Sequence, residues 1–379
     1  MLSKALIHSG AEVKIVSCSG RRGGINNFPS GGYRDGVPYE ILDSASYVTG
    51  FRLVDWAIRF ISARFILVKF LKTKNAASPN LIISYNPGAW VGSGILKWGK
   101  QNSVPIIFDI VEWFDVNQCL GGYFGPVFYD SELFIRCISK KADGLIVISR
   151  YLEEYYKQFG IATILIPGLI DVMSNPKVES PLFLDEKFRV LYSGSPGKKD
   201  MLLPLMEAAK IIRNLNILNI QFIFTGFNIL NALKIQNISP KLYENCSNVK
   251  ILGWLSEVDM NSVRNMSDIM IVFRQDNRSS LANFPQKFSE YMGSKKAVII
   301  NNVGDMKDYI QTGKNGIILN ELSGQVVADA IISISTEPDR AMTLGLNAFK
   351  TAKEFFDFRS ISNKLSLYFF EILASSNKR

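Results

Sequence analysis

The chain has 379 residues, of which 47% are apolar and 20% charged, and 43 Lys and Arg against 34 Asp and Glu give a formal net charge of +9. This composition predicts a folded protein of about two domains and excludes a disordered chain. Because the four cysteines have no C-x-x-C spacing and His8 is the single histidine, we expect neither a Cys/His metal site nor a Ser-His-Asp triad. The positive charge suits an anionic partner, but it is dispersed and no nucleic-acid module accompanies it, which argues against nucleic acid.

Cysteine usage and hydropathy indicate a cytoplasmic location. The sequence shows no signal-peptide pattern and no uncharged apolar run of about 18 residues that could span a bilayer. Residues 52–72 mix aromatic and basic side chains in a helical pattern. Such a helix packs against a sheet or lies on an anionic membrane surface, and both interpretations stay open. The second would make the protein peripheral on the inner face of the cytoplasmic membrane.

The first half of the chain predicts alternating helices and strands. Residues 2–10 are expected to end a helix that Gly10 closes, and Ser149 is expected to cap a later helix. Residues 18–38, rich in Gly and Arg, predict a mobile basic surface loop, with a flap that contacts an acceptor as the other interpretation. Strands are expected at 12–17, 81–85, 105–111, 144–148 and 164–166.

Acidic side chains follow the strand at 105–111. Asp109, Glu112 and Asp115 come at its C-terminal end, which is where ligands bind in open α/β sheets. Glu112 and Asp109 are therefore candidates to contact an acceptor hydroxyl or a hydroxyl of a donor sugar. The alternative is that backbone N–H groups hold these acids in an ordinary loop.

A second candidate site begins at the strand 188–193. The turn after it contains Gly194, Ser195, Lys198 and Lys199 and leads into a helix, an arrangement whose backbone amides can bind phosphate. We expect Lys199, and after it Lys198, to neutralise the phosphate charge. Arg274, at the C-terminal end of a strand at 270–273, could face the same group.

The donor site is completed by residues 283–292. Pro285 is expected at the first helical position, where its missing N–H costs nothing, so that the helix presents free N–H groups to a phosphate. Lys287 belongs to the same segment, and Glu290 could accept a hydrogen bond from a sugar hydroxyl. Together these residues suit a nucleoside diphosphate with its ribose. The alternative is a buried helix with one solvated glutamate.

The run Phe-Pro-x-Lys-Phe-x-Glu-Tyr-Met at 284–292 resembles the donor-site helix of retaining glycosyltransferases of family 4, and Asp-x-x-Glu-Trp-Phe-Asp at 109–115 resembles a subset involved in bacterial surface polysaccharide assembly. The resemblance implies the GT-B fold, with two doubly wound, Rossmann-like parallel-sheet α/β domains facing a cleft. Their expected limits are 1–170 for the acceptor-side domain, 171–186 for a linker, 187–355 for the donor domain, and 356–379 for a helix crossing back.

The family normally has a strand and a glycine-rich loop before the segment that opens this chain. The N-terminal domain is therefore expected to lack its first strand, which would leave the neighbouring strands with unpaired edges. Either the true start lies upstream or this copy is damaged.

The resemblance implies transfer of a hexose-like sugar from a nucleotide-sugar to a glycan or polyprenyl-linked glycan, with retention and with neither cofactor nor metal. In the family the glutamate at the Glu290 position holds the ribose as the second acid of a Glu-x7-Glu pair. Here Ala282 stands in place of the first acid. Two alternatives therefore remain, a degenerate non-catalytic nucleotide-sugar-binding protein and, less favoured, a nucleotide-sugar epimerase.

Overall fold

The chain folds into two compact units. The computed structural model describes residues 1–18, 30–42, 52–73, 79–119, 121–174, 183, 185–242 and 246–376. The first unit comprises Met1–Ile166 and Ile361–Arg379, and the second comprises Pro167–Ser360. Most of the linker expected at 171–186 lies outside the described residues.

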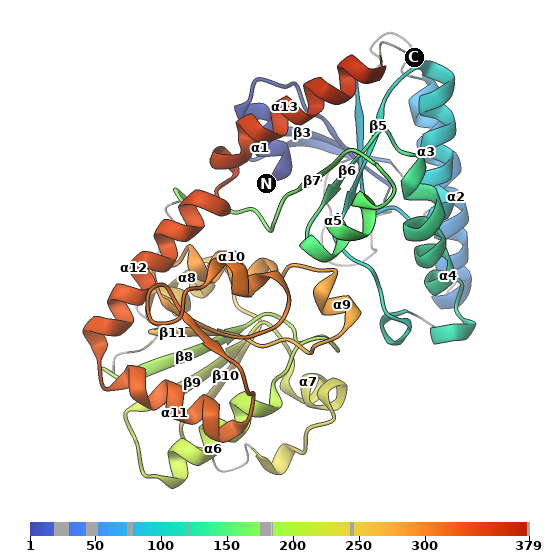
Figure 1. The fold of residues 1–379 in the computed structure, drawn as a ribbon. Coiled ribbons are helices and arrows are strands. Elements are labelled where there is room, and N and C mark those ends of the chain that lie inside the picture. The colour runs from blue at the N-terminus through green and yellow to red at the C-terminus, as the bar shows by residue number, and fades with distance from the viewer. Residues whose placement is uncertain are drawn as a thin grey trace. The chain divides into compact units, whose positions relative to one another are not determined.

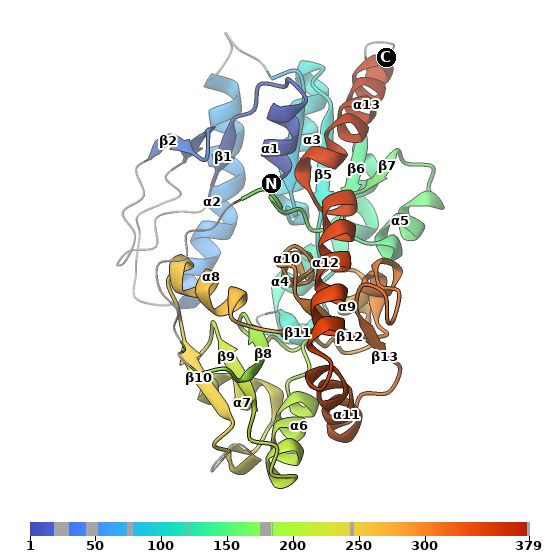
Figure 2. The same cartoon turned by 90° about the vertical axis from the view of Figure 1, so that its left-hand side faces the viewer.

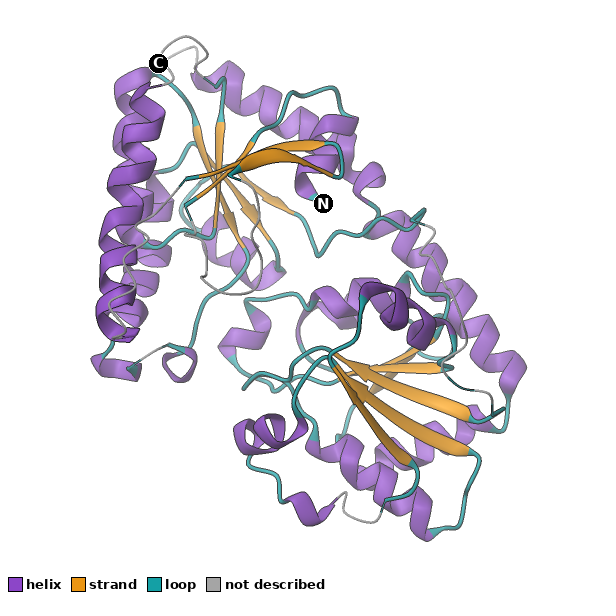
Figure 3. Ribbon diagram, turned by 180° about the vertical axis from the view of Figure 1, so that it is seen from behind, coloured by secondary structure: helices purple, strands orange, loops and turns teal. Residues whose placement is uncertain are grey.

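The second unit is built on one parallel sheet with the strand order β10-β9-β8-β11-β12-β13, drawn as a fan in Figure 3. Its central strands are mostly apolar, and apart from Phe188 all their residues are buried, as expected where helices cover both faces of a parallel sheet. The strands are β8 (Phe188–Ser193), β9 (Ile220–Thr225), β10 (Val249–Gly253), β11 (Ile269–Val272), β12 (Ala297–Asn301) and β13 (Ile317–Leu319).

Helices lie on both sides of this sheet. Figure 1 shows α6 and α11 on one side, where they share the apolar core with the strands, and α8 and α10 on the other. The helical elements are α6 (Leu203–Asn214), α7 (Ile229–Gln236), η5 (Pro240–Leu242), α8 (Glu257–Asn265), α9 (Arg278–Leu281), α10 (Gln286–Met292), η6 (Gly304–Tyr309), α11 (Gly324–Ser335) and α12 (Pro338–Phe355). The strand order reverses between β8 and β11, so this point is the topological switch point of a doubly wound sheet.

The first unit holds two sheets (Figure 2). The parallel one, in the order β4-β5-β6-β7, consists of β4 (Ile82–Tyr85), β5 (Ile106–Ile110), β6 (Gly144–Val147) and β7 (Thr163–Leu165). The other, in the order β1-β3-β2, consists of β1 (Ile15–Ser17), β2 (Gly31–Arg34) and β3 (Val37–Ile41). Among the described residues, β1 pairs with β3 alone and β4 with β5 alone.

The expectation of a loop over residues 18–38 is wrong for its second half. Residues 19–29 lie outside the described part of the chain, but β2 and β3 form an antiparallel hairpin joined by Asp35 and Gly36. Both turn residues have positive φ, +50° and +79°, as a two-residue hairpin turn requires. The Asp-Gly pair at 35–36 is the sequence signal that indicates this hairpin turn.

The helices of the first unit follow the predicted signals. Gly10 has a φ of +90° just beyond α1, and the Ser149 side chain accepts a hydrogen bond from Leu152 N at the start of α5. The helical elements are α1 (Leu2–His8), α2 (Arg52–Thr73), α3 (Ala89–Asn102), η1 (Val116–Gln118), η2 (Gly122–Phe124), α4 (Pro126–Leu133), the π-helical turn η3 (Phe134–Ile138), η4 (Ser139–Lys141), α5 (Arg150–Lys157) and α13 (Phe358–Ser376), which begins in the second unit. In the described part of the chain, no helix is both long and apolar enough to cross a membrane.

Gly345 of α12 packs closely against Lys295 and Lys296, in the segment that follows α10. A Cβ on Gly345 would lie 2.3 Å from the carbonyl oxygen of Lys295, a backbone atom that cannot swing aside. Gly345→Ala should therefore lower the free energy of unfolding by about 1–3 kcal/mol, read as a lower thermal midpoint. Leu346→Ala, at a 46% exposed position on the same helix, is the control. Equal shifts in the two variants would contradict this packing.

Candidate functional site

The switch point of the second unit brings two predicted segments together. Gln275 N donates a hydrogen bond to Lys199 O at 2.8 Å, and Asp200 forms an antiparallel bridge with Arg274. Asn301, at the end of β12, clamps the backbone of Arg274 from both sides, accepting from its N–H and donating to its carbonyl. The turn after β8 and the segment after β11 are thus held side by side, as the strand order requires.

Two glycines allow the turn after β8 to take its shape. Gly194 has a φ of +89°, and a Cβ on Gly226 would lie 2.8 Å from Gly194 N, so the ends of β8 and β9 approach too closely for a side chain. The turn closes where Gly197 N donates to the Asp200 carboxylate at 2.8 Å. Asp200 therefore faces into the turn and toward β11.

A buried ionic cluster lies at this point. Asp200 Oδ1 is 3.2 Å from Lys287 Nζ and 3.6 Å from Arg274 Nε, and the three side chains are 6%, 15% and 8% exposed. Lys287 Nζ also donates to the hydroxyl of Tyr192 at 3.0 Å. Two cations therefore share one carboxylate away from solvent, which leaves one positive charge in excess.

The electrostatics of the cluster favour an anion. Burial acts to raise the pKa of Asp200, but Lys287 and Arg274 outweigh it and hold that pKa below its usual value. Burial lowers the pKa of Lys287, and Asp200 opposes this shift. Arg274 Nη2 donates to Asn283 Oδ1 at 3.3 Å, but its buried Nε and Nη1 have no hydrogen-bond partner among the described residues. Buried donors of this kind are rare and can be satisfied by an anionic ligand.

Helix α10 is anchored to β8 by residues one turn apart. Lys287 reaches Tyr192, and Ser193 N donates to the hydroxyl of Tyr291 at 2.8 Å. Pro285 is the residue before the helix, so its expected place as the first helical residue is wrong by one position. The helix starts at Gln286, whose side chain donates to Leu169 O at 2.8 Å.

Glu290 lies apart from the cluster but within its electrostatic reach. Its carboxylate accepts a hydrogen bond from Arg264 Nη2 of α8 at 2.6 Å, and its charge, like that of Asp200, opposes the lowering of the Lys287 pKa by burial. Ala282, where the resembled family has its first acid, is fully buried at the end of α9. The next residue, Asn283, is the one that contacts Arg274.

The buried cations of this site are not those ranked first from the sequence. Lys198 is exposed and Lys199 half-buried, whereas Arg274 and Lys287 are held inside. Asp200 and Asn283 were not predicted to be site residues. The available signal for Asp200 was its place directly after two lysines at the end of the turn.

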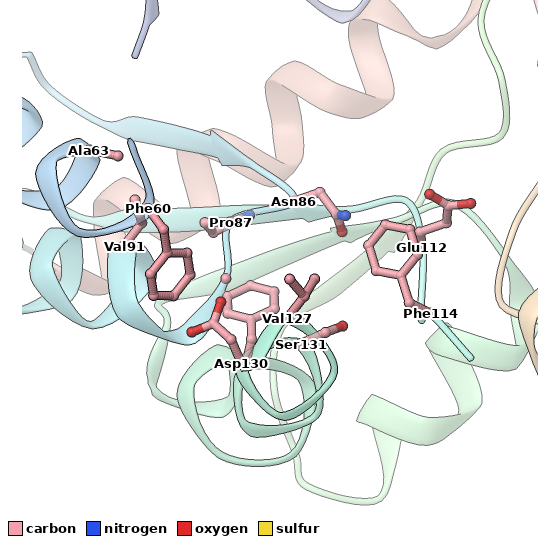
Figure 4. Close-up of a pocket in the computed structure, with 12 residues that line it drawn as sticks. Phe60, Ala63, Asn86, Pro87, Val91, Glu112, Phe114, Val127, Asp130 and Ser131 are labelled. Atoms are coloured by element: carbon pink, nitrogen blue, oxygen red, sulfur yellow. The ribbon is translucent and has the colours of Figure 1, made fainter. Parts of the chain in front are cut away.

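In the first unit, the two predicted acids have different surroundings. Asp109 is 8% exposed within β5, and burial raises its pKa to about 7, against the opposing charge of the Met1 amino group. Glu112 instead lines a pocket of about 240 Å³ together with Asn86 and Phe114 (Figure 4). Asp109 does not line this pocket, so of the two predicted acids only Glu112 is placed to contact a ligand there.

Asn86 was missed from the sequence. It has a φ of +37° and is held by two hydrogen bonds, from its N–H to Asp109 O at 2.7 Å and from Val111 N to its side-chain oxygen at 3.4 Å. A non-glycine residue held in this region often marks a functional site. The Asn-Pro-Gly sequence at the end of β4 was the available signal.

No cluster of three or more His, Cys, Asp or Glu side chains that could hold a metal ion occurs in the part of the chain that the structure describes.

The comparisons with known proteins agree with this architecture. Residues 175–351, somewhat less than half of the chain, match the family model described as "Glycosyl transferases group 1". Sucrose-phosphate synthase from Thermosynechococcus elongatus has a similar structure, with a TM-score of 0.71 at 16% identity over 99% of this chain and 92% of that one. A glycosyltransferase from Rickettsia africae gives a TM-score of 0.66 at 14% identity over 98% and 94% of the two chains.

Alr3699/HepE from Anabaena, in complex with UDP and glucose, gives a TM-score of 0.65 at 15% identity over 89% of this chain and 87% of that one. No curated protein matches the chain. The chain therefore has the GT-B fold of glycosyltransferases, as the sequence predicted, and its second unit carries the region that the group 1 model describes.

The raised pKa of Asp109 predicts a pH-dependent stability. The folded protein binds this proton more tightly than the unfolded chain, so the stabilisation is complete below about pH 4 and is lost as the pH rises through about 7. Asp109→Asn should remove this loss and be more stable than the parent at pH 8 by on the order of 2–4 kcal/mol. Thermal midpoints measured from pH 5 to pH 8 test this. Parallel curves for the two proteins would contradict it.

Proposed function

We propose that the protein is a glycosyltransferase that moves a hexose-like sugar from a nucleotide-sugar to an acceptor hydroxyl with retention of configuration. The second unit binds the donor and the first unit binds the acceptor. The observation that carries this proposal is the cluster of Asp200, Arg274 and Lys287 at the switch point, where a diphosphate would meet two buried cations.

The chemistry required of the cluster is electrostatic. A nucleoside diphosphate leaves with increasing negative charge, and fixed cations in a site shielded from water stabilise such charge strongly. Asp200 holds Arg274 and Lys287 in place, and the lysines of the turn, Lys199 above all, add positive charge nearby. Glu290 orients the ribose through a hydroxyl.

Retention is proposed from the resemblance, and the cluster offers no enzyme nucleophile for a double displacement. Two cations hold the pKa of Asp200 below its usual value, so this carboxylate is a weak base and a weak nucleophile. We propose front-face attack, in which a phosphate oxygen of the donor assists the incoming hydroxyl. Glu112, which lines the pocket of the first unit, contacts that hydroxyl. This route needs no metal and no further cofactor.

The nature of the substrates is proposed from similarity. Alr3699/HepE was solved with UDP-glucose, which supports testing uridine-diphosphate sugars first. The segment 109–115 supports a glycan or polyprenyl-linked glycan acceptor in surface polysaccharide assembly. A cytoplasmic protein that touches the inner membrane surface is consistent with helix α2, which exposes Val54, Ile61 and Phe65.

A non-catalytic nucleotide-sugar-binding protein is the second candidate, and Ala282 favours it because the acid expected near the transferred sugar is absent. Calorimetry with a panel of nucleotide-sugars, followed by a turnover assay on the same preparation, separates the two. Binding together with turnover supports the transferase. Binding without turnover or hydrolysis of any donor supports the second candidate.

Loss of Arg274 should weaken diphosphate binding while leaving the fold intact. In Arg274→Gln the carboxylate of Asp200 keeps Lys287 as a partner, so the cluster loses its excess positive charge, becomes neutral and stays folded. We expect the affinity for UDP to fall about 10- to 100-fold, the range for a lost charge-assisted hydrogen bond, and the affinity for uridine to stay unchanged.

The matched control is Arg278→Gln, which removes the same charge from the first residue of α9. It should change UDP binding less than three-fold by calorimetry, while circular dichroism verifies both folds. Equal losses in the two variants would mean that net charge, and not the cluster, governs binding.

A further inference from the structure

The pocket of the first unit has a polar end and an apolar end. Figure 4 shows Glu112 and Phe114 at one side and Phe60, Ala63 and Val91 at the other, with Asn86, Val127 and Ser131 between them. The apolar end is formed by two helices, because Phe60 and Ala63 come from α2 and Val91 comes from α3, and α4 adds Val127 in the middle of the pocket. Its volume of about 240 Å³ lies below the range of about 300–1,000 Å³ for pockets that enclose a whole drug-sized ligand. The pocket therefore holds part of a ligand.

Asp130 makes the middle of the pocket unsuitable for an anion. Its carboxylate accepts a hydrogen bond from Trp90 N at 2.9 Å and so caps the first turn of α3. A Cβ on Gly88 would lie 1.7 Å from Asp130 Oδ2, which shows how closely the carboxylate is seated on that turn. The N–H groups that could have bound a phosphate are thus already occupied, and by a negative charge.

The charges of the residues that line the pocket also argue against an anionic ligand. Among the described residues that line the pocket there is no lysine or arginine, whereas Asp130 and Glu112 are both acids. A phosphate or carboxylate inside would face repulsion without a compensating cation. A neutral ligand with an apolar part fits, because each methylene group transferred from water to an apolar site gains about four-fold in affinity.

Exposed apolar side chains outside the pocket lining lie on two of these helices, α2 and α4. Ile61 and Phe65 of α2 are 53% and 61% exposed, and Leu133 of α4 is 51% exposed. Ile61 is the neighbour of Phe60, and Leu133 is the neighbour of Phe134, which also lines the pocket.

We propose that this pocket binds the hydrocarbon part of an amphiphilic acceptor, placed next to the hydroxyl that Glu112 contacts. The inference rests on the proposed transfer reaction and makes it more specific, because it selects a lipid-linked acceptor over a free glycan. A phosphate between the hydrocarbon and the sugar would lie beside Asp130, so the acceptor that fits has an uncharged link at this point.

The test compares two glycosides that differ in hydrocarbon alone. The full chain is titrated by calorimetry with n-octyl β-glucoside below its micelle concentration and with methyl β-glucoside. We expect the octyl compound to bind at least ten-fold more tightly. Equal affinities, or binding of neither compound, would overturn the proposal.

Matched variants locate the binding site. Ala63→Phe fills the apolar end and should weaken octyl glucoside binding at least ten-fold, whereas Val54→Phe introduces the same side chain at a 46% exposed position of the same helix, outside the pocket lining, and should change it less than two-fold. Val91→Phe fills the pocket from α3 and replaces Ala63→Phe if that variant does not fold. Equal effects of the filling and control variants would overturn the proposal by placing the octyl chain elsewhere.

UDP binding, measured on the same preparations, keeps the two proposals apart. Ala63→Phe should leave it unchanged, because no residue of the donor cluster lies in the first unit. Octyl selectivity in a protein that does not bind UDP would refute the donor site and leave the pocket assignment standing. UDP binding without octyl selectivity would refute the pocket assignment alone.

Discussion

The second unit depends on one carboxylate that holds two cations. Asp200 keeps Arg274 and Lys287 charged and ordered in a buried site, and it also closes the turn after β8 through Gly197 N. Without it, two like charges would be buried together, which is unfavourable. With it, the excess of one positive charge remains modest and available to a ligand. The strand order places this cluster at the switch point, and Tyr291 fixes α10 against β8.

Three carboxylates of the first unit have different surroundings. Asp109 is buried within β5, and its pKa is raised. The Asp130 carboxylate accepts a hydrogen bond from the first turn of α3, and Glu112 lines the pocket. The strained backbone of Asn86 joins the ends of β4 and β5 beside that pocket. Three carboxylates close in the fold thus serve three roles, and only one is suited to contact a substrate.

Strands in the second unit were predictable because they are short apolar runs bounded by glycine and polar turns, and Phe188–Ser193 matches the expected limits. The donor segments were predictable for the same reason, since lysines, an arginine and a proline follow such strands. Which basic residues matter most in the site was not predictable, because that depends on which of them are buried. The sequence shows Lys199 and Lys287 as equivalent lysines, and tertiary packing alone places Lys287 against Asp200. Asp130 was missed because its partner, the first turn of α3, lies 40 residues away along the chain, and Asn283 was missed because its contact with Arg274 depends on how the loop between them folds.

The central claim is that the Asp200 cluster binds the diphosphate of the donor. A crystal structure of the full chain with a nucleoside diphosphate tests it most directly. The account predicts a phosphate oxygen within hydrogen-bond distance of the unpartnered Arg274 Nη1, with Lys287 close by. A diphosphate bound elsewhere, with Arg274 still facing Asp200 alone, would contradict it.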